Sequence, residues 1–243
     1  TDIYHYGLDE AEGDRLLAEY EVWEDMRARG AKVNVTLKKA NVPLVAGRID
    51  VAIVVHQPEK AVSKLMHDKG GRIWVYAQPF ASNEEAYPHR KGYGFGVYFA
   101  DYDGVCNYSF NHWQESPRRL PWRTDSGGAF YVFPTADGVA DTPGWEGYRE
   151  GIDDVRYATL LRREIAKALT GRYPEARSAA ARAVGLARRA AGALSGNAAA
   201  RRETAKAAAA FLEQVNIHAA DFDPEWTRLQ IIDWILDLIG EDA

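Results

Sequence analysis

The chain has 243 residues, of which 47% are hydrophobic and 27% are charged, and this composition excludes a disordered tail. The mildly acidic balance of 35 acidic against 30 basic residues argues against a dedicated nucleic-acid-binding protein. No apolar run is long enough to span a membrane, and the single cysteine, Cys106, excludes an internal disulfide.

Strand and helix signals alternate in the first part of the chain. Short runs rich in β-branched and aromatic residues predict five strands, at residues 3–8, 32–37, 50–55, 72–76 and 104–109. Helical spacing of apolar residues predicts helices between them, at residues 12–29, 58–69 and 90–100, the last broken by glycines. This alternation is typical of βα units, so we expect an α/β fold with a parallel sheet over residues 1–150.

The second part of the chain is expected to be helical. Helices are predicted at residues 153–169, 176–194, 198–215 and 224–239, and we interpret residues 151–243 as a small helical bundle. The Ala- and Arg-rich stretch favours a solvated basic helix face over an RNA-binding surface. No nucleic-acid partner and no membrane contact is therefore expected.

Most common catalytic motifs are absent from the sequence. There is no phosphate-binding loop, no nucleophile elbow and no paired cysteine spacing, and the six scattered histidines form no metal-binding pattern. We therefore predict neither a metal nor a cofactor. The glycine-rich stretch at residues 92–96 follows no strand, so we interpret it as a place of close packing or a hinge.

Two adjacent acids, Asp9 and Glu10, follow the first predicted strand directly. In parallel α/β proteins the active site lies outside the carboxyl ends of the strands, so acids at this place favour a catalytic role. The alternative is structural, because acids also cap the amino end of a following helix. The pair alone does not decide between these two interpretations.

Aromatic and amide side chains gather at the later strand ends. Trp74 and Tyr76 lie on the fourth predicted strand, and Asn107, Tyr108 and Trp113 lie on or after the fifth. A sugar pocket needs flat ring faces for C–H groups and hydrogen-bonding side chains for hydroxyl groups. These residues are therefore candidate carbohydrate-binding residues.

Four segments together resemble glycoside hydrolase family 123 and its broader relatives. They are Tyr-Gly-Leu-Asp-Glu at residues 6–10, Trp-Val-Tyr at 74–76, the stretch at 107–113, and the block at 142–157 that contains Arg-Glu-Gly-Ile-Asp-Asp. The last block is the most specific, and the resemblance covers roughly residues 1–170.

The resemblance implies a TIM-type (β/α) barrel, partial or complete, and the removal of β-linked N-acetylgalactosamine by substrate-assisted retaining catalysis. It implies that Glu10 is the general acid/base, and that Asp9 holds the acetamido group whose oxygen attacks the anomeric carbon. Tyr6 falls in the same segment and is carried over as a substrate-binding residue. A neighbouring Asp carboxylate is expected to raise the pKa of Glu10 so that it can donate a proton.

The sequence departs from the family pattern in two ways. Ala11 stands where a proline often follows the acid pair, and only five strand units are visible, whereas a closed barrel needs eight. The acid pair normally comes midway through the barrel, so the chain resembles the carboxyl half of a family member. We therefore expect an upstream barrel half or a second copy of the chain to complete the sheet.

Two alternatives to a glycosidase stay open at this point. One is a non-catalytic carbohydrate-binding or scaffold protein that keeps the aromatic pocket. The other is a helical interaction module whose functional surface is the Ala- and Arg-rich region.

Overall fold

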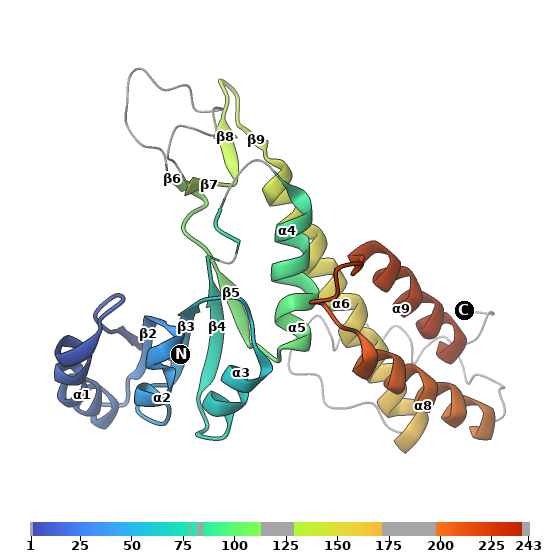
Figure 1. Ribbon diagram of the computed structural model, residues 1–243, viewed down its shortest axis with the longest axis horizontal. Coiled ribbons are helices and arrows are strands. Elements are labelled where there is room, and N and C mark those ends of the chain that lie inside the picture. The colour runs from blue at the N-terminus through green and yellow to red at the C-terminus, as the bar shows by residue number, and fades with distance from the viewer. Residues whose placement is uncertain (1, 78, 82–84, 113–128, 172–197, 240–243) are drawn as a thin grey trace. The chain divides into compact units, whose positions relative to one another are not determined.

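The computed structural model describes residues 2–77, 79–81, 85–112, 129–171 and 198–239 (Figure 1). The chain divides into two compact units, Thr1–Ile152 and Asp153–Ala243. A parallel sheet with helices between its strands confirms the α/β class expected from the sequence.

The sheet of the first unit has five parallel strands in the spatial order β1-β2-β3-β4-β5, which is also their order along the chain. All five were predicted, and the sheet residues are β1 Tyr4–Tyr6, β2 Lys32–Lys38, β3 Val51–Val55, β4 Arg72–Tyr76 and β5 Gly104–Cys106. The strands β1 and β5 are the two edges, because each pairs with one neighbour among the described residues.

The connections between the strands are helical. They are α1 Gly13–Ala28, the 3₁₀ turn η1 Lys39–Asn41 with α2 Val42–Val45, α3 Lys60–His67, and the run of α4 Ala86–Lys91, the π-helical η2 Gly92–Gly96 and α5 Val97–Phe99. The short helix α2 was not predicted, because four residues are too few to show a helical period.

The apolar core lies on one face of the sheet. Val33, Val35 and Leu37 of β2, with the alternate residues of β3 and β4, pack in one buried cluster against side chains of all four helical connections. The other residues of these strands lie outside that cluster, because successive side chains of a strand point to opposite faces. The helices therefore cover the same side of the sheet.

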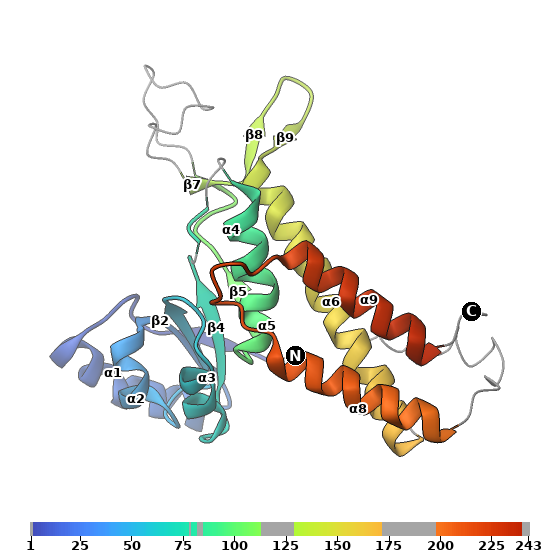
Figure 2. The same ribbon diagram turned by 45° about the vertical axis from the view of Figure 1, so that its right-hand side comes forward.

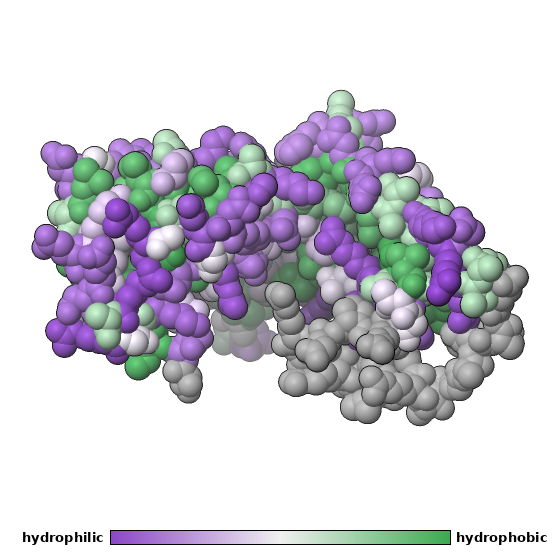
Figure 3. Space-filling model, turned by 90° about the horizontal axis from the view of Figure 1, so that it is seen from below, coloured by the Kyte–Doolittle hydropathy of each residue, from purple (hydrophilic) through white to green (hydrophobic). Residues whose placement is uncertain are grey.

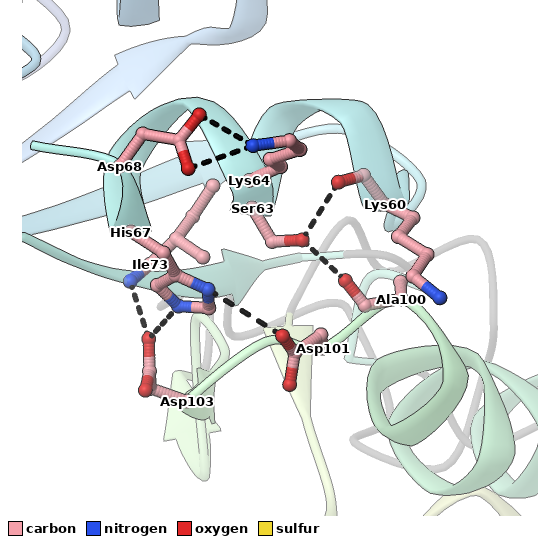
Figure 4. A network of polar contacts seen from close by, with 9 residues as sticks. All are labelled: Lys60, Ser63, Lys64, His67, Asp68, Ile73, Ala100, Asp101 and Asp103. Carbon is pink, nitrogen blue, oxygen red and sulfur yellow. Dashed lines mark hydrogen bonds and ion pairs between the residues drawn. The ribbon is translucent and has the colours of Figure 1, made fainter.

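A polar network lies at the amino ends of β4 and β5 (Figure 4). One carboxylate oxygen of Asp103, just before β5, accepts the backbone N–H of Ile73 and lies 2.9 Å from Nε2 of His67 on α3. The hydroxyl of Ser63 on α3 donates to the carbonyl of Ala100 at 2.6 Å. These contacts tie α3 to both strands at the end opposite the acid pair, so we assign them a role in stability.

Two short antiparallel strand pairs precede the long helix α6 Pro143–Thr170. They pair β6 Asn111–His112 with β7 Ala129–Phe130, and β8 Val132–Pro134 with β9 Val139–Asp141. The helix starts ten residues before the predicted residue 153. Thr142 caps it by accepting the N–H of Trp145 on its hydroxyl, and Pro143 follows as the first helical residue.

Glycines bring α6 against the run of α4 and η2. An added Cβ on Gly151 would lie 2.9 Å from the carbonyl oxygen of Arg90, and one on Gly94 would lie 2.8 Å from the Cα of Gly151. An added Cβ on Gly147 would overlap the carbonyl of Ala86. Close packing at residues 92–96 is thus confirmed. The start of α6 was not predicted, because Gly147 and Gly151 lie in it and glycine disfavours helices.

The second unit contains the later part of α6, together with α8 Ala198–Gln214 and α9 Pro224–Ile239, which pack side by side (Figure 2). The fully buried carboxylate of Asp154 on α6 forms an ion pair with the guanidinium of Arg228 on α9. The helix expected at residues 176–194, and with it most of the Ala- and Arg-rich region, lies outside the described residues.

The surface is mostly hydrophilic on the face shown in Figure 3, with smaller hydrophobic patches between the polar residues. None of the helices in the described ranges combines the length and the apolar character that a membrane crossing requires.

The glycine contacts predict an unusual response to alanine. In an exposed helix, Gly→Ala stabilises by about 1 kcal/mol, but Gly147→Ala and Gly151→Ala place a methyl group against backbone atoms. We expect each variant to lose about 1–3 kcal/mol of unfolding free energy in urea denaturation. Arg156→Ala, at a side chain 75% exposed on the same helix, should change little; equal stability of all three variants would contradict the contact.

Candidate active site

The acid pair lies just beyond the carboxyl end of β1. The chain leaves the strand through Gly7, where an added Cβ would come within 2.8 Å of the Trp23 indole nitrogen and of a Val35 methyl group. The N–H of Gly7 donates to the carbonyl of Asn34, and the N–H of Glu10 donates to that of Thr36, both at 3.0 Å. Two backbone bonds along β2 thus fix the position of the pair.

The helix-capping alternative for the acid pair is wrong. The N-cap of α1 is Glu12, which makes no side-chain capping bond, and the helix begins at Gly13. The carboxylate of Glu12 instead pairs with Lys38 at 2.7 Å. Glu10 has a φ of 47°, in the left-handed region that costs a residue with a side chain about 1–3 kcal/mol. Such local strain is typical of functional sites.

Asp9 is held by a short chain of hydroxyl groups. The Tyr6 hydroxyl donates to Oδ1 of Asp9 at 2.6 Å and lies 2.5 Å from Oγ1 of Thr36. Because the one phenolic hydrogen goes to the carboxylate, Thr36 donates to Tyr6. Burial, and then the bond to Asp9, raise the pKa of Tyr6 to about 12, so the phenol keeps its proton.

Tyr76 lies at the carboxyl end of β4, further across the sheet from the acid pair. It ends β4 and stands beside Cys106 of β5. Its pKa is raised first by burial and then by the negative charges of Asp9 and Glu10, so both acids lie within electrostatic reach of its ring. Burial also raises the pKa of the Cys106 thiol to about 11, which leaves it protonated and a poor nucleophile.

Trp74 lies one row deeper on the same face as Tyr76. An added Cβ on Gly104 would come within 2.9 Å of three atoms of its indole ring, so the indole lies across β5 where a side chain is missing. The register places Thr36, Ile53, Trp74 and Gly104 in one row across four strands. Trp74, which is half-buried, therefore belongs to the floor beneath the strand ends.

Asn107 has a structural role in the described residues. Its amide nitrogen lies 2.7 Å from the Tyr93 hydroxyl, 2.6 Å from the Tyr131 hydroxyl and 3.0 Å from the Pro79 carbonyl, and its oxygen accepts the N–H of Tyr108. Both amide hydrogens are thus committed to the protein. Tyr108 itself is 43% exposed beside the strand ends, and Trp113 lies outside the described residues.

The sequence reasoning missed Thr36 and Lys38. Both lie on β2 and alternate with the buried Val35 and Leu37, so their side chains lie on the face opposite the core. Lys38 also lies near Glu10, whose charge contributes to its raised pKa after the larger effect of Glu12. The polar residues at every second position of the predicted strand were the signal that pointed to them.

The arrangement combines a positioned carboxylate, a second carboxyl group next to it in the chain, and flat aromatic surfaces. In the ranges that the structure covers, no His, Cys, Asp and Glu side chains group so as to hold a metal ion. A scan against protein-family models found no match, and neither did a search of curated proteins.

An aromatic cluster supports the strand end after β5. Tyr131 packs with Trp145 and Tyr148, and the buried His89 meets the Tyr131 ring edge-on at 5.5 Å. The two ring nitrogens of His89 lie 2.9 and 3.1 Å from the carbonyl oxygens of Glu85 and Phe80. Burial lowers the pKa of His89 in spite of these acceptors, so the neutral ring is favoured in the folded protein.

This lowered pKa predicts a loss of stability in acid. As the pH falls below about 6.5, His89 takes up a proton in the unfolded state but resists protonation in the folded state. The free energy of unfolding therefore falls by up to about 1.4 kcal/mol per pH unit. Denaturant unfolding of the wild type and of His89→Gln at pH 7.5 and 5.0 measures this effect. We expect a smaller difference between the two pH values in the variant, and the same difference in both proteins would exclude His89 as its source.

Proposed function

We propose that the chain is part of a glycoside hydrolase that removes a β-linked N-acetylhexosamine, most simply N-acetylgalactosamine, by substrate-assisted retaining catalysis. The observation that carries this proposal is the acid pair at a strained turn beyond β1, with Asp9 oriented by the Tyr6 hydroxyl and both acids within electrostatic reach of Tyr76. The proposal also rests on the resemblance in four segments of the sequence.

Each acid has a role that fits its surroundings. Asp9 would accept the acetamido N–H and stabilise the positive charge that develops as the acetamido oxygen attacks the anomeric carbon. Glu10 would protonate the leaving oxygen and then take a proton from the water that opens the oxazoline. Since the substrate supplies the nucleophile, the separation of two carboxylates does not govern this mechanism.

The sugar would lie on the face of the sheet opposite the core, near the strand ends. The candidate contacts are Tyr6, which bonds Asp9; Tyr76, which both acids reach electrostatically; and the exposed Tyr108. Trp74 lies deeper as the floor. Asn107 acts in this proposal as a positioning residue that fixes the backbone of Tyr108. Thr36 positions Tyr6, and through it Asp9.

We further propose that the sheet is a segment of a (β/α) barrel. Its strands run parallel and in chain order, and its connections pack on one face, as in a barrel segment and unlike a doubly wound sheet. The opposite face retains the exposed Tyr4 and Tyr6, and both edges are open among the described residues. An upstream barrel half or a second copy of the chain would cover them.

The catalytic proposal predicts the effect of Glu10→Gln. The substitution removes the transferable proton and keeps the shape, so we expect kcat/KM on an aryl 2-acetamido-β-glycoside to fall by about 10²–10⁴ with binding largely kept. Glu21→Gln, an exposed change on α1, is the matched control and should retain full activity.

The comparison substrate is the same aryl glycoside without the acetamido group. Hydrolysis of the plain glycoside at an equal rate would exclude substrate assistance. Sugar binding that is unaffected by Glu10→Gln, with no hydrolysis of either substrate, would instead support a carbohydrate-binding protein.

The open sheet predicts an assembly larger than one chain. A face that is exposed in part, at Tyr4 and Tyr6, together with two open edges favours association, so we expect light scattering to give a dimer, or a one-to-one complex when an upstream half is supplied. A stable, compact monomer that forms no such complex would contradict the proposed cover.

A further inference from the structure

A pocket lies in the second unit, where α8 passes into α9. It has a volume of about 620 Å³, within the range of small-molecule sites, and it is lined by residues from Phe211 to Thr227. All of its lining residues belong to the same unit and to the described part of the chain.

The apolar part of the pocket contains three aromatic rings, besides Val215 and Ala219. Phe222 is buried and Phe211 is half-buried, whereas Trp226 is 56% exposed at the rim. The rings of Phe211 and Trp226 are 6.4 Å apart and inclined by 59°. The exposed indole therefore presents a flat apolar surface next to a recessed one.

The rim is held in place by local hydrogen bonds. Oδ1 of Asp223 accepts the backbone N–H groups of Glu225 and Trp226 and so caps α9, and Oδ1 of Asn216 accepts the N–H of His218. These bonds fix the backbone on both sides of the pocket, so ligand binding would lose little conformational entropy in ordering it.

Three polar side chains at the rim retain hydrogen-bonding capacity. Within the described ranges, the amide of Gln214, the amide nitrogen of Asn216 and the carboxylate of Asp221 bond to no other residue. They offer donors as well as acceptors. The charged residues of the lining are the acids Asp221 and Asp223, and none of its residues is basic, so an anionic ligand is disfavoured.

We propose that this pocket is a second carbohydrate site, which binds a neutral segment of the glycan apart from the acid pair. Sugar hydroxyl groups both donate and accept, and so match the mixture of amide and carboxylate groups; an organic cation would leave the amide donors unmatched. The C–H face of a pyranose fits the exposed ring of Trp226. The choice of a sugar as ligand rests on the proposed function.

Titration calorimetry tests this site in the Glu10→Gln protein, with a β-linked tri-N-acetylhexosamine as the probe. We expect Trp226→Ala to weaken binding about tenfold or more, and Trp226→Phe to keep most of it. Leu229→Ala is the matched control, since Leu229 is 50% exposed on the same helix and does not line the pocket. Asp221→Asn should weaken binding less than Trp226→Ala.

The outcomes separate this site from the catalytic proposal. Equal affinity of the Trp226→Ala and control proteins would overturn the pocket even if Glu10→Gln abolished hydrolysis. Displacement of the probe by a tetraalkylammonium ion at a concentration similar to that of the probe would indicate a cation-binding site. That result would also overturn the proposed carbohydrate site. Binding that depends on Trp226, together with a wild-type protein that hydrolyses neither aryl glycoside, would support the pocket and refute the enzyme.

Discussion

The one-sided core is the constraint on which the rest of the structure depends. Side chains from every connection between the strands, such as Trp23 of α1 and Met66 of α3, pack on the same face of the sheet. Parallel strands joined in this way must curve or leave their other face without apolar cover. The polar and aromatic residues of that second face, and the acid pair at its edge, follow from this arrangement.

The two ends of the sheet perform different tasks. At the amino ends, Asp103 and His67 satisfy backbone and side-chain groups of neighbouring elements, and Asp101 of the same network has a positive φ of 59°. At the carboxyl ends, Glu10 and Ala77 both have positive φ although neither is glycine. Strain persists where the surrounding structure enforces it, and here backbone bonds to β2 enforce it at Glu10.

The sequence predicted the strands well, because each is a short run rich in β-branched or aromatic residues. The alternation of Val33, Val35 and Leu37 with polar residues also indicates that Thr36 lies on the face opposite the core. The extent of α6 could not be predicted, because Gly147 and Gly151 are unfavourable in an isolated helix and are needed only through contacts with Ala86 and Gly94. Asn107 resembled a ligand-binding amide for a similar reason, since its partners Tyr93 and Tyr131 are remote in sequence.

Cover over the second face would serve stability and chemistry together. Tyr6 is 49% exposed, although its hydroxyl is committed to Asp9 and Thr36, so water competes for both bonds. Excluding that water would strengthen the hold on Asp9 and, in the proposed reaction, the electrostatic effect of both acids on the substrate. The same cover would pair the edge strands β1 and β5, which lack outer neighbours among the described residues. Assembly and catalysis would therefore depend on a single surface, and a substitution that weakens association should also weaken hydrolysis.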